Sequence, residues 1–250
     1  MRLAAYELRR WAMVALVAST LGTAMQAAAE RPDFTGVWGV YREPGQQGFG
    51  FRRGAGENLP LKPEARAKVD AYRALIEPSG DSPGGWCLGS GMPGSMLGSG
   101  GYPMEIVQHD NLLVVVYEAH TEVRHIYLAN RAAEGDLFPD RNGYSFGHWD
   151  GDHLIVETTH LKEAVDQRQY PHSANARIVE DYHLVANDDG SKVLVADLTM
   201  TDPDFYTEPV KTTKKWALEP GVRLLPYECN EPAWEDHLDE LRKQQGKTGG

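Results

Sequence analysis

The sequence is poor in cysteine and lacks most of the short motifs that define a chemistry. Its 250 residues include two cysteines, Cys87 and Cys229. It contains no GxSxG motif of a serine hydrolase, no HExxH motif of a zinc protease and no CxxC redox pair. The glycine-rich run at residues 80–101 contains no GK[ST], and no GxGxxG that follows a strand. The enzyme classes that these motifs define are therefore not expected.

The sequence also has fewer basic than acidic residues, with 25 lysines and arginines against 36 aspartates and glutamates. The chain has a formal net charge of −11, and loss of residues 1–29 would make it more acidic because that segment holds more arginine than glutamate. Binding to nucleic acid or to anionic lipid depends on clustered lysine and arginine, so we expect neither partner. No apolar run after residue 29 is long enough for a transmembrane helix, and we expect no membrane insertion of the mature chain.

The first 29 residues have the pattern of a secretory signal. Arg2, Arg9 and Arg10 precede an apolar stretch at residues 11–24, and Ala27–Ala29 supplies small residues for cleavage near Ala29. The sequence therefore predicts a periplasmic or secreted protein. The Arg9-Arg10 pair leaves both the general secretory route and twin-arginine export open.

The two cysteines would then lie in a compartment that oxidises thiols. Two cysteines permit a single intramolecular pairing, so the expectation is a structural disulfide between Cys87 and Cys229. Two buried thiols, or a thiolate used in catalysis or metal binding, are the alternatives.

The hydrophobic pattern predicts one mainly-β domain. Residues 30–101 should hold a strand around FTGVWGVY, a helix at 61–76 with Pro63 near its first turn, and a long ordered loop or lid at 80–101. Residues 102–231 read as short strands joined by turn signals such as Asp110-Asn111 and Asp150-Gly151. Such strands predict an antiparallel up-and-down meander that closes into a lipocalin-like barrel, with a β-sandwich as the alternative. Residues 232–250 should form a short helix and a tail.

The expected strands of the barrel share a high content of β-branched and aromatic residues. They are MEIVQH (104–109), LLVVVYE (112–118), EVRHIYL (122–128), YSFGHW (144–149), HLIVETT (153–159), RIVEDYHLV (177–185), KVLVADLTM (192–200), VKTTKKWAL (210–218) and VRLLPYE (222–228).

The run GHWDGDHLIVETTH (147–160) resembles a metal site because it contains three histidines and three carboxylates. If Asp150 and Gly151 form the turn, His148 faces His153 near the end of a hairpin, and His160 lies about 20 Å away at roughly 3.3 Å per residue. Two histidines without a third ligand do not satisfy zinc. The sequence therefore predicts no metal site within this run, and it places Trp149 with the core residues of the opposite face.

Charged residues within apolar strands are the main indication of chemistry. The Asp110-Asn111 turn places Glu105 opposite Val116, in a strand pair whose two faces are both apolar. Arg124 lies on the face opposite His125, and Glu180 shares a face with three apolar or aromatic residues: Ile178, Tyr182 and Leu184. A buried carboxylate needs a partner or a raised pKa. Glu118 is the diagonal neighbour of Glu105 on the same face, and the alternative is that both point to solvent or pair structurally with Arg124.

His172, in a loop before a strand, is the candidate general acid or base at the barrel mouth. It would act with Glu105 or Glu180, while Arg124 orients the substrate or stabilises an oxyanion. Tyr206, Trp149 and Tyr117 are the expected ligand-binding residues. A capping or structural role for His172 is the alternative.

Seven motifs extend over nearly the whole mature chain. They are DFTGVW (33–38), YPMEIVQ (102–108), VRHIYL (123–128), GHWDGDHLIVETT (147–159), PHSANARIVEDY (171–182), DPDFYTEP (202–209) and YECNE (227–231). Together they resemble a large family of exported bacterial proteins, most of them known as hypothetical proteins. The resemblance implies an exported β-rich fold and supplies no established catalytic residues.

The family's usual pattern includes the candidate residues Glu105, Arg124, Trp149, His172, Glu180, Cys87 and Cys229. Relatives commonly have a basic residue at the position of His148 and a hydroxyl residue at that of His153. The resemblance therefore argues against a family metal site in this run, and it implies a shared role for the two cysteines.

Three functions are consistent with the sequence. The first is an exported enzyme of lyase, isomerase or dehydratase type, which uses no cofactor and acts on a small, largely apolar or aromatic molecule. The second is a lipocalin-like carrier of such molecules. The third is a metalloprotein whose ligands come from distant strands, such as His172, His120 and a carboxylate.

Overall fold

The computed structural model describes residues 31–41, 59–78, 80, 82–98, 101–166, 169–230 and 243. Internal contacts divide the chain into residues 1–30 and residues 31–250, and all described residues belong to the second unit. The expected signal segment and, except for residue 243, the expected C-terminal helix lie outside the described residues.

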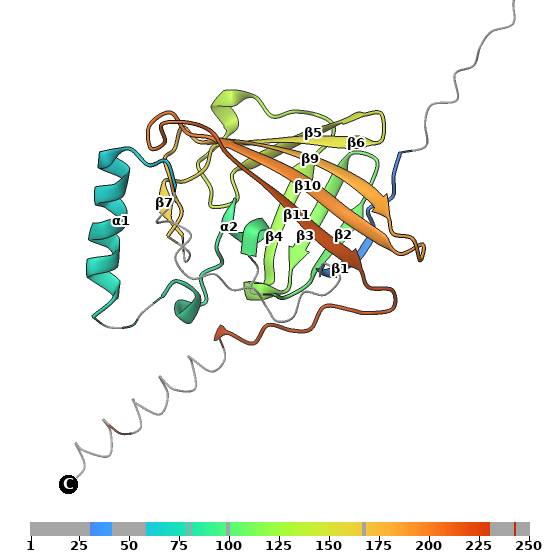
Figure 1. Cartoon of the computed structure of the whole chain (residues 1–250), viewed down its shortest axis with the longest axis horizontal. Coiled ribbons are helices and arrows are strands. Elements are labelled where there is room, and N and C mark those ends of the chain that lie inside the picture. The colour runs from blue at the N-terminus through green and yellow to red at the C-terminus, as the bar shows by residue number, and fades with distance from the viewer. Residues whose placement is uncertain are drawn as a thin grey trace, which may run out of the picture. The chain divides into compact units, whose positions relative to one another are not determined.

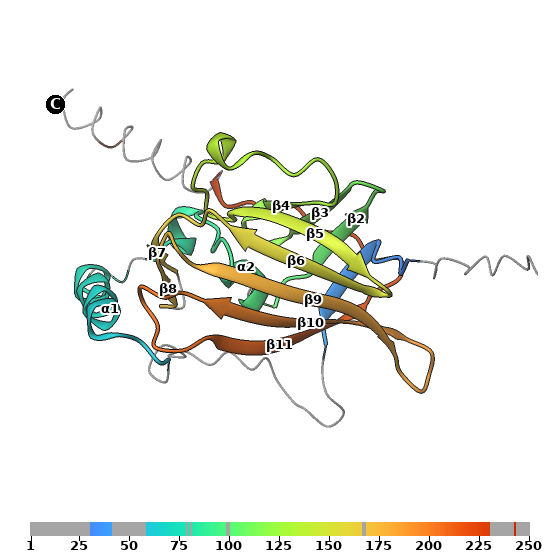
Figure 2. The same cartoon turned by 90° about the horizontal axis from the view of Figure 1, so that it is seen from above.

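Nine strands of the described part close into a barrel, as the sequence predicts (Figures 1 and 2). Around the barrel their order is β1-β11-β10-β9-β6-β5-β4-β3-β2, and β1 pairs with both β11 and β2. The strands are β1 (Gly36–Val40), β2 (Met104–Gln108), β3 (Leu112–Tyr117), β4 (Glu122–Tyr127), β5 (Tyr144–Asp150), β6 (His153–Thr159), β9 (Arg177–Ala186), β10 (Lys192–Thr201) and β11 (Val210–Leu218). Because the sheet closes, no edge strand remains in the barrel.

The expected antiparallel meander is wrong at one place. Strands β4 and β5 are parallel, with Ile126 paired to Ser145 and Tyr127 paired to Phe146. A parallel pair cannot be joined by a tight turn, so residues 128–143 must return along the barrel before β5 begins. The last expected strand, VRLLPYE, is also wrong, because residues 222–228 adopt no regular structure.

Alternation along the strands fills the barrel with side chains. On β3, Leu113, Val115 and Tyr117 are buried while the residues between them are partly exposed, and this period of two separates the inner from the outer face. The inner residues of all nine strands form one apolar core, with Trp38 and Leu194 completely buried.

Helix α1 (Pro63–Ile76) lies at one end of the barrel, opposite the turn that joins β9 and β10, whereas the short helix α2 (Gly94–Gly98) lies among the strands (Figures 1 and 2). Helix α1 begins at the predicted proline and buries Ala65 and Val69. Helix α2 and the 3₁₀ helix η2 (Gly84–Trp86) come from the glycine-rich segment; η3 (Ala119–Thr121) and η4 (Glu134–Asp136) lie in loops.

The glycine-rich segment is an internal plug as well as an ordered loop. Met92 and Met96 are buried in the barrel core, and Glu122 on β4 binds the segment by accepting hydrogen bonds from the Gly91 N–H at 3.0 Å and from the Ser95 hydroxyl. The absence of side chains on the glycines allows this close approach to β4. The segment therefore closes the interior from within.

The two predicted hairpin registers have different outcomes. Glu105 faces Val116, as the Asp110-Asn111 turn predicts. In the second hairpin Asp150, and not His148, faces His153, so the turn residues are Gly151 and Asp152. Gly151 has φ +62°, which fits a type II′ turn with glycine at its first central position.

The Cys87–Cys229 disulfide is present and joins the glycine-rich segment to the chain after β11. A separate two-stranded sheet, β7 (Ala164–Val165) and β8 (Pro171–His172), lies at the same end of the barrel as α1. None of the helices in the described residues has the length and apolar character that a membrane span requires.

Candidate functional site

Arg124 and Glu180 form an ion pair inside the barrel. Their side chains are 1% and 0% exposed. The Nη1 atom of Arg124 donates to Oε1 of Glu180 at 3.0 Å, and Nη2 donates to Oε2. This two-point geometry matches the planar guanidinium to the carboxylate. The sequence pattern correctly predicted that both charges face inward.

Hydroxyl groups complete the surroundings of the pair. Arg124 donates from Nε to Ser145 Oγ at 3.1 Å, from Nη2 to Thr158 Oγ1 at 2.8 Å and from Nη1 to the Tyr182 hydroxyl at 3.3 Å. Tyr182 in turn donates to Glu180 Oε1 at 2.9 Å. A guanidinium has five N–H donors, and all five of Arg124 have partners here.

The raised pKa of Arg124 agrees with a buried pair in which the guanidinium stays charged. Burial opposes the charged form of Arg124, but the Glu180 carboxylate raises the pKa of Arg124 well above its usual value. Burial also raises the pKa of Tyr182 well above its usual value, and it raises the pKa of Tyr117 to about 12. Because the donors of Arg124 are all engaged, the geometry favours a structural role for the pair over the expected oxyanion and proton-transfer roles.

Glu105 does not join this pair. Its neighbours Met104 and Ile106 are buried in the core, whereas Glu105 is partly exposed and lies on the outer face of β2. The strand period of two dictates this placement. The expectation of a carboxylate inside the barrel at this position is wrong. Glu118 is also outside the pair, since its carboxylate accepts a hydrogen bond from the Leu225 N–H at 2.7 Å.

His172 lines a cleft of about 240 Å³ at the α1 end of the barrel. The other walls come from α1, the glycine-rich segment and the β7 region. This His172 cleft is lined by Tyr72, Pro83, Leu88, Gly89, Ser90, Arg141, Lys162, Glu163, Ala164, Val165, Asp166 and His172. The sequence thus identified one of its residues and missed the others, because no local pattern joins these segments.

The surroundings of His172 favour the neutral form of its imidazole. It is 3% exposed, and burial lowers its pKa despite the nearby carboxylates of Asp202 and Glu163. Its Nδ1 atom has no hydrogen-bond partner among the described residues. A neutral imidazole with one unpaired nitrogen is able to accept or relay a proton. Neither Glu105 nor Glu180 contacts it in the described part of the chain, so the expected pairing of His172 with these carboxylates is not formed.

Tyr206 lines a second cleft, of about 310 Å³, at the same end. We call it the Tyr206 cleft, and its lining is mostly apolar. The lining residues are Leu59, Pro93, Leu97, Tyr170, Leu198, Met200, Tyr206, Val210, Lys211, Thr212 and Lys214. The Tyr206 hydroxyl donates to the Pro171 carbonyl at 2.7 Å, so Tyr206 links this cleft to the β8 strand that carries His172.

The other expected ligand-binding residues do not reach these clefts. Tyr117 is buried in the core beside Arg124. Trp149 is at the end of β5 near the Gly151 turn, where its ring centroid is 5.4 Å from that of Phe34. The strand registers place this turn at the opposite end of the barrel from Tyr206. The structure therefore separates Trp149 and Tyr117 from Tyr206.

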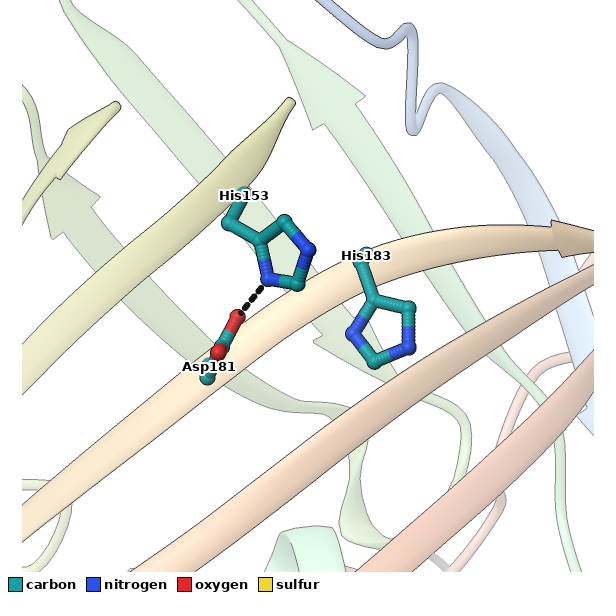
Figure 3. Close-up of side chains that lie close together, drawn as sticks. All are labelled: His153, Asp181 and His183. Atoms are coloured by element: carbon teal, nitrogen blue, oxygen red, sulfur yellow. Dashed lines mark hydrogen bonds and ion pairs between the residues drawn. The ribbon is translucent and has the colours of Figure 1, made fainter. Parts of the chain in front are cut away.

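On the outer wall of the barrel, His153 on β6 meets Asp181 and His183 on β9 (Figure 3). One nitrogen or oxygen from each residue lies within 4.8 Å of the others. His153 Nδ1 is 2.6 Å from Asp181 Oδ1, and the rings of His153 and His183 stack with centroids 4.7 Å apart. The sequence analysis considered His153 within residues 147–160, where it predicted no metal site, and it did not consider Asp181 or His183. The pairing of β6 with β9 brings these two residues close to His153.

Two other histidines considered in the sequence analysis, His160 and His120, make contacts with neighbouring side chains. His160 forms an ion pair with Glu134, with 3.0 Å between His160 Nε2 and the carboxylate. His120 packs against Tyr227 with ring centroids 4.8 Å apart. Neither residue belongs to the group of His153, Asp181 and His183.

Comparisons with family models and with curated proteins found no relative. No family model matches the chain, and no curated protein matches it. The resemblance to exported bacterial proteins therefore stays a prediction.

Proposed function

We propose that the protein binds a small molecule with an apolar body and an acidic group in the Tyr206 cleft. The observation that carries the proposal is an apolar cleft at the mouth of a barrel, with lysine at its border. Leu198 and Met200 supply the inner wall from β10, and Lys214 lies on the inner face of β11 between Thr212 and Trp216. Ligand sites commonly combine an apolar lining with a few polar groups.

The charge of the ligand follows from β11. Along this strand the residues Val210, Thr212 and Lys214 alternate with more exposed ones, so Lys214 faces the cleft side and Lys215 faces solvent. Lys211 adds a second positive charge to the lining. In a protein with a net charge of −11, these lysines provide a local positive potential that favours an anionic group.

Dodecanoate and dodecanol are suitable probes because they differ only in the head group. Calorimetric titration should show that dodecanoate binds more tightly. The Lys214→Met change should weaken dodecanoate binding about tenfold or more, which corresponds to the loss of a hydrogen bond to a charged group. Lys215→Met, on the outer face of the same strand, is the matched control and should leave binding unchanged. Equal effects of the two variants would indicate general electrostatic attraction and contradict the proposal.

A steric test addresses the cleft without altering charge. Thr212→Trp should fill the cleft and abolish binding of both probes, while Thr213→Trp on the outer face should preserve it. Circular dichroism would verify that both variants are folded. Binding that survives Thr212→Trp would place the ligand elsewhere.

Acid–base chemistry at the His172 cleft is the second candidate function. A buried neutral imidazole with an unpaired Nδ1 favours it, together with Asp166 and Glu163 in the same lining. His172 would act as general acid or base in a lyase, isomerase or dehydratase reaction. The molecule recovered from the native protein should gain deuterium at carbon in D₂O with the wild type and not with His172→Gln. Recovery of the molecule unchanged would leave binding as the function.

We also infer that the protein acts outside the cytoplasm. The Cys87–Cys229 disulfide supports this inference, because such bonds persist in oxidising compartments. N-terminal sequencing of the protein from a periplasmic or secreted fraction should give a start near Glu30. A product that begins at Met1 would contradict the expected cleavage.

A further inference from the structure

We propose that His153, Asp181 and His183 form a binding site for a divalent transition metal ion of the zinc class on the outer wall of the barrel (Figure 3). The proposal is independent of both clefts, which lie at the end of the barrel nearest α1.

The positions of the three side chains follow from strand register. Leu154 pairs with Tyr182 and Ile155 pairs with Asp181, so His153 and His183 are the next opposed positions across β6 and β9. Leu154 and Tyr182 point inward and are buried, and residues on either side of them therefore point outward. Asp181 lies two residues before His183, on the same face. Two rigid neighbouring strands thus hold all three ligands.

The chemistry of the three groups fits zinc. Two imidazole nitrogens and one carboxylate oxygen, with a water in the fourth position, make a common zinc ligand set. Ligand atoms around a tetrahedral zinc ion lie roughly 3.3 Å apart, given metal–ligand distances of about 2.0–2.1 Å. In the structure the three ligand atoms lie within 4.8 Å of one another. The side chains of His153 and Asp181 are 39% and 37% exposed. Because solvent leaves room around them, small side-chain rotations would bring their ligand atoms to coordination distance from the ion.

Two further observations favour a cation at this place. The Nδ1 atom of His183 is buried and has no hydrogen-bond partner among the described residues, which leaves a nitrogen ligand unused. The surroundings of the site are acidic. Asp150 on β5 pairs with His153, and Asp197 on β10 pairs with Asp181. Asp152 lies 4.0 Å from His153 Nε2. These carboxylates lower the energy of a bound cation and leave the histidines as its selective ligands, because Mg²⁺ and Ca²⁺ prefer oxygen.

Calorimetric titration of the purified protein without a polyhistidine tag tests the site. Zn²⁺ should bind with one ion per chain, and Mg²⁺ should not bind. His153→Ala, His183→Ala and Asp181→Asn should each weaken Zn²⁺ binding by about tenfold or more, since loss of even an outer-shell partner commonly costs that much. His148→Ala is the matched control, because His148 is exposed on the same outer face of neighbouring β5.

Electron paramagnetic resonance of the Cu²⁺ form gives a second measurement. The wild type should show coupling to two imidazole nitrogens, and His183→Ala should show coupling to one. The three variants change side chains on the outer wall of the barrel, and circular dichroism would verify their fold. The proposal is overturned if wild type and His183→Ala bind Zn²⁺ equally, if His148→Ala is as weak as His153→Ala, or if Asp181→Asn leaves the affinity unchanged.

Discussion

Arg124 on β4 and Glu180 on β9 are 56 positions apart in the chain and form a buried two-point ion pair within the barrel. Removal of one partner would leave an uncompensated charge in the interior. We therefore expect Glu180→Gln to lower the free energy of unfolding by about 3–5 kcal/mol, as measured by urea denaturation.

The double change Arg124→Met with Glu180→Leu should be less destabilising than the sum of the single changes, because both charges leave the core together. The exposed pair Arg177–Glu157 is the control, and Arg177→Ala should lower stability by about 1 kcal/mol or less. Similar losses of unfolding free energy at the buried and the exposed pair would contradict the buried two-point ion pair.

The Cys87–Cys229 disulfide joins residues 142 positions apart. A link across so long a loop restricts the unfolded chain, so Cys87→Ser with Cys229→Ser should reduce stability by up to about 4–5 kcal/mol. Thermal denaturation with and without a reducing agent measures this effect. Reductant should destabilise the wild type and leave the double variant unchanged; a wild type insensitive to reductant would be evidence against the link.

The buried imidazole of His172 predicts a pH dependence. Its pKa is lowered in the folded state, so below the unfolded value of about 6.5 the unfolded chain binds more protons. Stability that is fully present above pH 6.5 should decline as the pH falls toward the lowered folded pKa, by at most about 1.4 kcal/mol for each unit between the two pKa values.

Urea denaturation between pH 7.5 and 5.5 tests this decline, with His172→Gln as the reference that lacks the titrating group. The raised pKa of His153 contributes with the opposite sign and is common to both proteins, so their difference isolates His172. Parallel stability curves for the two proteins would refute the expectation.

Two glycines with similar φ angles allow a matched test of steric contact. Gly143 has φ +63°, and an added Cβ would lie 2.5 Å from the Thr159 carbonyl oxygen; Gly151 has φ +62° and open space around it. Gly151→Ala should lower stability by roughly 1 kcal/mol through its backbone angle alone. Gly143→Ala should lose about a further 1–3 kcal/mol through overlap, and equal losses in chemical denaturation would contradict the contact.

The sequence predicted what depends on local periodicity. The period of two in RIVEDYHLV placed Glu180 inside, and the Asp110-Asn111 turn gave the correct pairing of Glu105 with Val116. The second hairpin was displaced by one residue because glycine is acceptable at either central position of a tight turn. The displacement changed the partner of His153 and left its face unchanged, since both alternatives place it outside the barrel.

Features formed by distant segments could not be predicted in this way. The partnership of His153 with His183 requires β6 to pair with β9 across the β7–β8 insertion. The two clefts depend on the glycine-rich segment turning inward, and its sequence has no hydrophobic period that specifies an inward path. Glu105 was assigned to the interior because both faces of its strands are apolar, although the core occupies only one.

The ladder between β4 and β5 contains two paired positions, whereas β9 and β10 share ten. The two ladders of β1 contain three paired positions each, so the β4–β5 ladder is the shortest of the barrel, and we expect it to open first on heating or under force. Arg124 on β4 donates to Ser145 on β5 and binds Glu180 farther around the wall. Arg124 therefore connects three strands across this short ladder, and we expect the resistance of the barrel to opening to depend on the buried charge pair.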